Sequence, residues 1–193
     1  MTDSSAPGPD RGPLSPEQQR QLAEANQRAR KVLGAARVAA FNGWTIGSIA
    51  GLSLLFGLFS KTALVMGIAM GIVAWNEFRG RALLRAFDPD GPRLLGKNQL
   101  GFLAVIVGYC LWSMYTTATG QNAELAEIEA MIGPVSDLAR DLTVMVYGVV
   151  LFLSVVFQGL NARYYFARER LVREYLQHTP DWVVKLQKST SIY

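Results

Sequence analysis

The stretch VAAFNGWTIGSIAGLSLLFGLFS, residues 38–60, extends over 23 positions without a charged side chain. Three further uncharged runs follow at residues 62–76, 98–123 and 142–162. The helix of a soluble core meets water on one face and carries a charge every turn or two, whereas a membrane span needs about 20 predominantly apolar residues. The four runs therefore predict four transmembrane helices.

The composition agrees with this interpretation, because 50% of the 193 residues are hydrophobic and only 18% are charged. One compact soluble domain is excluded, and the connectors leave no room for a separate catalytic domain. We expect an all-α integral membrane bundle at residues 38–160, with spans at about 38–60, 62–78, 99–117 and 137–160. The second span is the shortest, and its helix would extend about 26 Å against a hydrocarbon core of about 30 Å.

Polar segments flank the predicted bundle. Residues 1–14 contain three prolines and few apolar side chains, which predicts a disordered tail. Ser15 and Pro16 then form a helix-start signal, and apolar residues at helical spacing predict an amphipathic cytoplasmic helix at 15–37. This helix either lies at the membrane interface or continues into the first span. Residues 161–193 predict a second amphipathic cytoplasmic segment, which is basic.

Basic residues are divided unequally between the two sides of this topology. The termini and the loop between spans two and three carry 17 of the 19 lysines and arginines, and the other side keeps only Lys61 and Arg140. With the acidic residues included, the net charges are 17 − 10 = +7 and 2 − 5 = −3. Because lysine and arginine near span ends are retained in the cytoplasm, both termini are expected there, in a multi-pass protein of the cell (inner) membrane.

Small residues recur at every fourth position of the first two predicted spans. Residues 60–61 alone separate these spans, so the chain must form a tight hairpin in which Gly51 roughly faces Gly71 and Gly47 roughly faces Ala74. In lipid, small-residue faces let helix backbones approach closely. We expect the two faces to meet, and the alternative is a homodimer face. The predicted helix-packing residues are Gly43, Gly47, Gly51, Gly67 and Gly71.

Polar side chains intrude only on the cytoplasmic half of the predicted spans. Glu77 stands out, since an ionisable group at a span end can pair with a neighbouring amide, bind a cation or relay a proton. The favoured interpretation is an interfacial ion pair with Arg79 or Arg81. For the amides we favour interhelical hydrogen bonds that fix the register of the bundle. This predicted ring consists of Asn42, Asn76, Glu77, Asn98, Gln99, Gln158 and Asn161.

Residues for catalysis or metal binding are scarce. The single cysteine, Cys110, lies in an apolar run, and the single histidine, His178, has no cysteine or paired acid beside it. No phosphate-binding, dinucleotide-binding, zinc-protease or serine-hydrolase motif is present. We therefore expect no catalytic residues, no cofactor and no metal site. The basic residues lie beside the spans rather than in an aromatic-interleaved patch, so nucleic acid is not expected as a partner.

The function predicted from these features is a non-enzymatic scaffold or accessory subunit that presents a basic cytoplasmic surface to anionic lipid headgroups or to a protein partner, another membrane protein or a second copy. The alternatives are an ion or small-solute transporter or channel subunit, a membrane-shaping hairpin protein and, least favoured, a lipid-modifying enzyme. An apolar strip between arginines on the helix after span four supports the leading hypothesis, and we expect it to dock on the bilayer surface, on the 79–97 connector or on another protein. The predicted lipid or partner surface comprises Arg79, Arg81, Arg85, Arg163, Arg168, Arg170, Arg173, Tyr164, Leu171, Tyr175 and Trp182.

Overall fold

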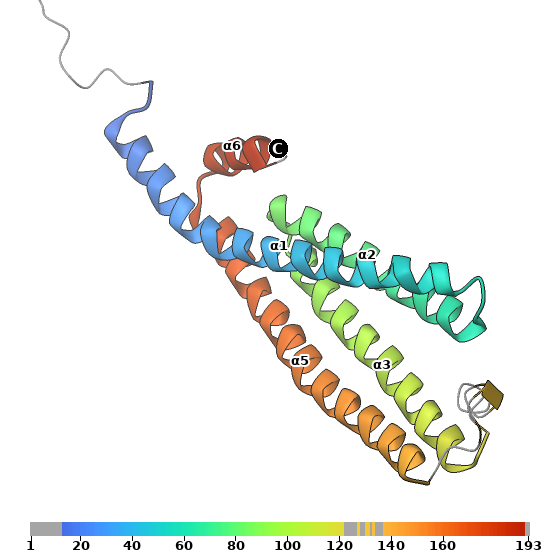
Figure 1. The fold of residues 1–193 in the computed structure, drawn as a ribbon. Coiled ribbons are helices and arrows are strands. Elements are labelled where there is room, and N and C mark those ends of the chain that lie inside the picture. The colour runs from blue at the N-terminus through green and yellow to red at the C-terminus, as the bar shows by residue number, and fades with distance from the viewer. Residues whose placement is uncertain (1–12, 122–126, 128–129, 132, 134–136, 192–193) are drawn as a thin grey trace, which may run out of the picture.

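The computed structural model describes residues 13–121, 127, 130–131, 133 and 137–191. The described residues form five helices and no strand (Figure 1), which confirms the all-α prediction. The predicted tail at 1–14 falls almost entirely outside the described residues. The helices are α1 (Pro16–Phe56), α2 (Lys61–Arg85), α3 (Asp90–Ala118), α5 (Asp137–His178) and α6 (Asp181–Ser191).

Helix α1 begins at the predicted capping signal. The Ser15 hydroxyl accepts from the Gln18 backbone N–H at 3.2 Å, and the Gln18 side chain accepts from the Ser15 N–H at 2.9 Å. This reciprocal cap satisfies two backbone donors that the first helical turn leaves unpaired. The helix then continues for 41 residues to Phe56. The polar segment 15–37 and the first apolar run thus form one helix about 60 Å long.

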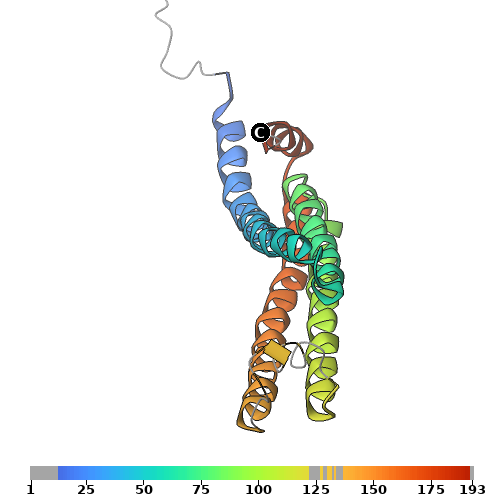
Figure 2. The same ribbon diagram turned by 45° about the vertical axis from the view of Figure 1, so that its right-hand side comes forward.

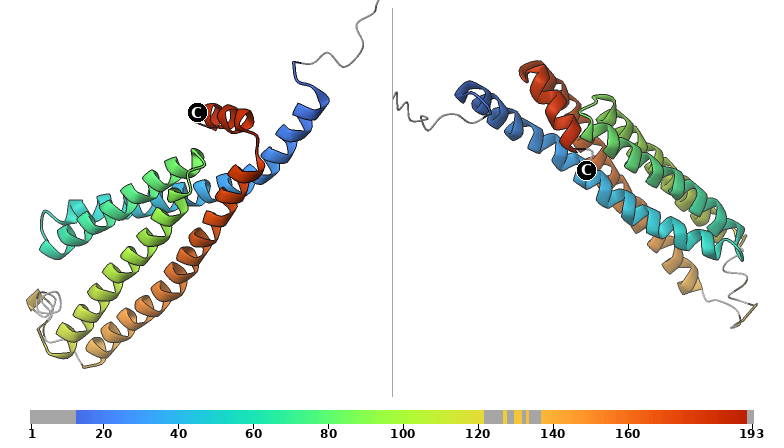
Figure 3. Two further views of the ribbon diagram at one scale, coloured as in Figure 1. Left: turned by 180° about the vertical axis from the view of Figure 1, so that it is seen from behind. Right: turned by 90° about the horizontal axis from the view of Figure 1, so that it is seen from above.

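The long helices pair into two antiparallel hairpins, α1 with α2 and α3 with α5. The hairpins lie together at one end of the molecule and diverge toward their tips (Figures 1 and 2). The view from behind shows the same divergence (Figure 3). The turn between α2 and α3, the start of α1 and the end of α5 all lie at the shared end.

We call the shared end the basic module and define it as residues 16–37, 79–97 and 163–191. Its core is built around Phe87, whose ring stacks on Tyr175 with centroids 4.4 Å apart. Phe87 has φ 53°, a left-handed conformation that turns the chain sharply after α2. The Tyr175 hydroxyl donates to Gln187 at 2.6 Å, and Gln187 in turn donates to Asn26 at 2.7 Å. Helix α6 is thereby fixed to both α5 and α1.

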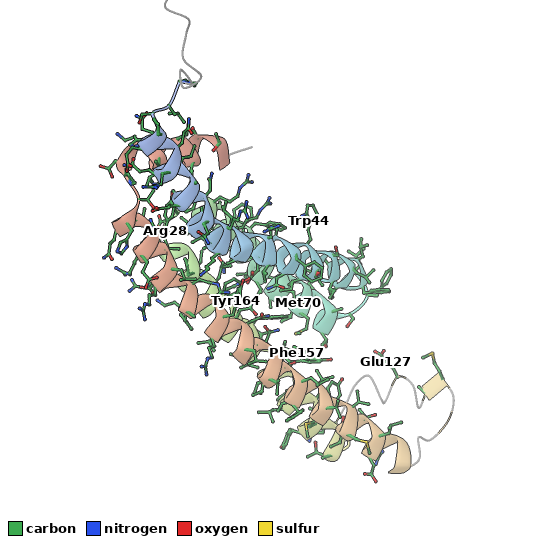
Figure 4. All side chains as sticks on the ribbon, turned by 90° about the vertical axis from the view of Figure 1, so that its left-hand side faces the viewer. Arg28, Trp44, Met70, Glu127, Phe157 and Tyr164 are labelled. Carbon is green, nitrogen blue, oxygen red and sulfur yellow. The ribbon has the colours of Figure 1, made fainter. Side chains whose placement is uncertain are left out.

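Three helices in the described part of the chain are long and apolar enough to cross a membrane, within Pro16–Phe56, Asp90–Ala118 and Arg140–His178. Helix α2 is not among them, so the prediction of four spans is supported for only three of its helices. Asn76 and Glu77 interrupt the apolar stretch of α2 near one end, and Lys61 bounds it at the other. Outside the basic module, large apolar side chains such as Trp44 and Phe157 face outward (Figure 4).

The α1–α2 hairpin uses only part of the predicted glycine face. A Cβ atom on Gly43 would lie 3.1 Å from Phe78, one on Gly47 would lie 3.6 Å from Ala74, and one on Gly67 would lie 2.9 Å from Leu54. The expected facing of Gly47 and Ala74 is therefore confirmed. Gly51 and Gly71 have no neighbour within 4 Å of such an atom, so the expected contact between these two is wrong.

Candidate functional site

Glu77 is the centre of a polar cluster at the point where the two hairpins meet. Its side chain is completely buried, with 0% of its surface exposed. Asn98 Nδ2 and Gln99 Nε2, both on α3, each donate to Glu77 Oε1 at 2.8 Å. The Tyr165 hydroxyl on α5 donates to Glu77 Oε2 at 3.4 Å. The α2 carboxyl group thus receives three hydrogen bonds from the other hairpin.

Two more hydrogen bonds extend the cluster to the remaining long helix and to the backbone. Asn42 Nδ2 on α1 donates to the Tyr165 hydroxyl at 3.3 Å, and Asn98 Nδ2 also donates to the Val73 carbonyl at 3.0 Å. All four long helices therefore contribute a side chain to one connected network. Each of these two hydrogen bonds connects a helix of one hairpin to a helix of the other. The cluster therefore links α1 to α5 as well as α2 to α3.

The predicted ion pair between Glu77 and Arg79 or Arg81 is wrong. Within the described ranges, Glu77 is in no ion pair. Its carboxyl group points toward α3 and α5, where amide and hydroxyl donors satisfy it. Arg79 is exposed to solvent or lipid, and Arg81 lines a groove between α1 and α2.

The predicted polar ring is only partly assembled. Asn42, Glu77, Asn98 and Gln99 meet in the cluster, whereas Asn76 lines a separate groove between α2 and α3. On α5, Asn161 is half-buried, and the buried Gln158 Oε1 has no hydrogen-bond partner among the described atoms. Tyr165 was not among the residues predicted from the sequence to form this ring. The available signal was its spacing, because Tyr165 follows Gln158 by seven residues and Asn161 by four, which places all three on one helix face.

A buried carboxyl group with this environment has two chemical uses. As a carboxylate without a cation it carries a desolvation cost of several kcal/mol, which three donors offset in part. As a neutral acid it needs an acceptor, and the amide groups of Asn98 and Gln99 carry a carbonyl oxygen as well as an NH₂ group. The cluster therefore suits either a fixed polar link between helices or a site that takes up a proton or a cation.

A second feature is a groove on the basic module between α1 and α2, which we call the arginine groove. Arg30 and Arg37 of α1 line it together with Arg81 and Arg85 of α2. Its floor is apolar, formed by Leu33, Ala36 and Ala40, and its volume is 450 Å³. Arg81 and Arg85 belong to the lipid or partner surface predicted from the sequence, but Arg30 and Arg37 do not. Only the pairing of α1 with α2 brings these two pairs of arginines together.

Other arginines of the basic module are neutralised within the chain. Arg93 Nε lies 2.9 Å from Glu169 Oε2, Arg173 lies 2.9 Å from Glu169 Oε1, and Arg170 lies 2.6 Å from Glu174. Hydrogen bonds from Arg173 and Arg93 hold the pKa of Glu169, which lies beyond the predicted span, below its usual range. Arg168 stacks over the Tyr164 ring at 4.0 Å. Arg168, Arg170 and Arg173 are part of the predicted partner surface, yet much of their charge is already engaged in contacts within the chain.

The apolar strip predicted for the partner surface is largely covered by the chain itself. Tyr175 is buried against Phe87, and Leu171 and Tyr164 pack against the same core. Trp182 is half-buried, and its indole N–H donates to Gln21 at 3.3 Å. Of the three places where the strip was expected to dock, it occupies the 79–97 connector, together with α1, so Tyr175 does not face lipid or a partner.

Within the described residues, no group of three or more histidine, cysteine, aspartate or glutamate side chains is arranged to hold a metal ion. Cys110 is buried in α3, and the exposed His178 side chain lies within 2.9 Å of the Glu174 carbonyl. Comparison with known proteins gives no further indication, since no protein-family model, no curated protein and no solved structure matches this chain.

Proposed function

We propose that the protein is a non-enzymatic integral membrane protein, a scaffold or accessory subunit, that presents a basic cytoplasmic surface to anionic lipid headgroups or to a protein partner. The observation that carries the proposal is the arginine groove, where four arginines of two helices surround an apolar floor. The folding of the α5 strip onto the module supports it as well. Because Tyr175 and Phe87 are buried inside the basic module, the outward faces of the module carry mainly charged side chains.

The proposal includes four spans with both termini in the cytoplasm. Helix α2 pairs with α1 along the hairpin and exposes Val65, Ile68, Ile72 and Trp75, an apolar face that favours lipid over water. The unequal division of basic residues supports the orientation. A basic module next to the inner leaflet would gain about 1 kcal/mol of attraction to anionic lipid for each arginine near the surface.

Charge reversal on the outward face tests this function. Arg79→Glu with Arg163→Glu changes two exposed residues of the basic module, whereas Lys61→Glu with Ser60→Glu changes the opposite end. After extraction in mild detergent, we expect the first variant to insert and fold normally but to retain less anionic lipid or to lose a copurifying protein. The second variant should retain both the anionic lipid and the copurifying protein. Equal retention by the wild type and both variants would contradict the proposed surface.

Glu77 favours a second candidate, an ion or small-solute transporter subunit. A completely buried carboxyl group without a cation, contacted from two other helices, is a common feature of proton and cation pathways. Proteoliposomes with a trapped pH-sensitive or sodium-sensitive dye would test this candidate. Uptake that depends on the protein and is lost in Glu77→Gln would favour transport, and absence of uptake in both would favour the scaffold.

A further inference from the structure

We infer that the arginine groove is a binding site for the headgroup of a phospholipid with two negative charges, such as a diphosphatidylglycerol. The inference rests on the proposed function, which requires only a basic surface, and deepens it by naming one site and one class of lipid. Four guanidinium groups in one groove exceed what a general orientation signal requires. Guanidinium groups also match phosphate oxygens in paired hydrogen bonds, which favours phosphate over other anions.

The placement of the arginines gives the site two sides. Arg30 and Arg37 are seven residues apart on α1, which corresponds to two turns or about 10 Å. Arg81 and Arg85 are one turn apart on α2, about 6 Å between their Cβ atoms. A headgroup with two phosphates can therefore contact both helices at once, whereas a single phosphate reaches fewer of the arginines.

Most of the charge of this groove is not neutralised by acidic side chains of the described residues. In the part of the chain that the structure describes, Arg30, Arg37 and Arg81 have no acidic partner, while Arg28, Arg93, Arg170 and Arg173 each pair with a glutamate or aspartate. Arg85 has an interaction of its own within the chain. Three unneutralised arginines in a groove repel each other, and an anion relieves this repulsion.

The apolar part of the groove favours a lipid over a soluble anion. The floor residues Leu33 and Ala40 lie on one face of α1, and the next residue on that face toward the hairpin tip is Trp44. Trp44 packs edge to face against Phe78 of α2 with centroids 5.6 Å apart, and its side chain is 69% exposed. The groove thus passes from arginines to an apolar floor and then to exposed aromatic rings. This order matches a phosphate headgroup followed by its glycerol and acyl chains.

The test measures lipid binding by the full chain in phosphatidylcholine nanodiscs that contain a few per cent of diphosphatidylglycerol. The groove variant is Arg30→Gln, Arg37→Gln and Arg81→Gln, and the control is Arg20→Gln, Lys61→Gln and Lys185→Gln, which removes three exposed basic residues outside the groove and outside the predicted lipid or partner surface. We expect one tightly bound diphosphatidylglycerol in the wild type and the control, and an affinity about 100-fold lower in the groove variant.

A second variant keeps every charge. Ala40→Phe fills the floor of the groove, and we expect it to reduce binding of the lipid while the total anionic lipid around the protein stays the same. Thermal unfolding of each variant in lipid-free detergent shows whether it is folded. Inorganic phosphate and glycerophosphate, added at millimolar concentration, should not displace the lipid; displacement would mean a phosphate site without lipid selectivity and would overturn the inference.

The outcomes separate this inference from the proposed function. If the groove variant binds the lipid as the wild type does but Arg79→Glu with Arg163→Glu retains less anionic lipid, the basic surface stands and the specific site is wrong. If neither of these two variants loses lipid, both the surface and the site are wrong. Equal loss in the groove variant and its control also rules out the specific site. Loss confined to the groove variant and to Ala40→Phe supports the site.

Discussion

The two hairpins differ in how their helices pack and in what they present at their tips. In the α1–α2 hairpin, Gly43, Gly47 and Gly67 lie at the helix contact. In the α3–α5 hairpin, Gly96 lies against the Phe166 ring in the basic module, but Gly101, Gly108 and Gly148 lie in open space. There the contact includes the rings of Tyr109 and Tyr147, whose hydroxyl oxygens are 3.4 Å apart. Outside the basic module, the first hairpin thus packs through glycines and the second through larger side chains.

The tips differ in polarity. At the α1–α2 tip, Phe56, Leu58 and Phe59 are 60%, 79% and 91% exposed. The segment that connects α3 to α5 contains Glu124, Glu127 and Glu129 in the sequence. Apolar tip residues favour lipid and carboxylates favour water. The comparison therefore predicts that the first hairpin crosses the membrane but ends at its outer lipid boundary, and that the second hairpin extends into the water beyond it.

Thiol labelling of the two tips tests this difference and has the largest expected effect. In a Cys110→Ala background, Glu127→Cys should react fully with an impermeant thiol reagent added to intact cells, and Lys188→Cys should be protected. Ser60→Cys should react at least 10-fold more slowly than Glu127→Cys, because the exposed apolar side chains around it hold the tip in lipid. Equal rates at Ser60→Cys and Glu127→Cys would show that the tip of the first hairpin also extends into the water, and labelling of Lys188→Cys would invert the orientation.

Glycine substitutions test the difference in packing. Gly67→Ile places a side chain 2.9 Å from both the side chain and the backbone nitrogen of Leu54, and we expect a loss of about 3 kcal/mol in stability because a backbone atom cannot move aside. Gly71→Ile, one turn away on the same helix, and Gly108→Ile on α3 have free space and should have little effect. The midpoint of thermal unfolding in mild detergent measures this. A loss of dimers in Gly71→Ile, with unchanged monomer stability, would identify an intermolecular glycine face.

The sequence predicted the helical hairpin but not the whole of its contact face. Folding the chain at residues 60–61 correctly places Gly47 opposite Ala74. A glycine at every fourth position, however, turns by about 40° per step around a helix with 3.6 residues per turn. Gly51 is therefore rotated by about 80° from Gly43, and Ala50 takes its place at the contact, where it is 3% exposed.

The candidate site was predictable in its location but not in its pairing. Polar residues at one end of the spans indicated where a network would form, and four of the seven predicted residues meet there. The short distance in the sequence favoured an ion pair between Glu77 and Arg81, which is four residues away on the same helix. The structure shows that α3 brings Asn98 and Gln99 to the carboxyl group, and no local pattern contains that contact between hairpins.

Substitution of Glu77 tests whether this cluster holds the two different hairpins together. Glu77→Leu leaves Asn98, Gln99 and Tyr165 without their acceptor, and we expect a loss of about 2 kcal/mol in the free energy of unfolding. Glu77→Gln keeps one acceptor oxygen and should cost less. Thermal unfolding in detergent measures both. Equal stability of Glu77→Leu and the wild type would mean that the donors find other partners and that packing alone joins the hairpins.

The smallest expected effect concerns α6, which forms a second link between the hairpins. The Tyr175 hydroxyl donates to Gln187, and Gln187 donates to Asn26 of α1, so a chain of two hydrogen bonds connects α5 of the second hairpin to α1 of the first. Tyr175→Phe keeps the ring stacked on Phe87 but removes the hydroxyl. We expect a loss of about 1 kcal/mol, the net value of one buried hydrogen bond.

Because this link lies in the basic module, its loss should appear locally before it appears in global unfolding. Limited trypsin digestion should cleave Tyr175→Phe faster at Lys185 and Lys188, which are both exposed on α6, while the long helices stay intact. Tyr164→Phe is the matched control, since it removes a hydroxyl group from a half-buried tyrosine on the same helix. Faster cleavage only in Tyr175→Phe would show that α6 is held by this hydrogen bond. Equal cleavage of both variants and the wild type would show that the Phe87–Tyr175 stack, the apolar contacts of Val183 and the hydrogen bond from Trp182 to Gln21 suffice to hold α6. The polar connection between the hairpins would then depend on the Glu77 cluster and on the hydrogen bond from Arg28 to the His178 carbonyl.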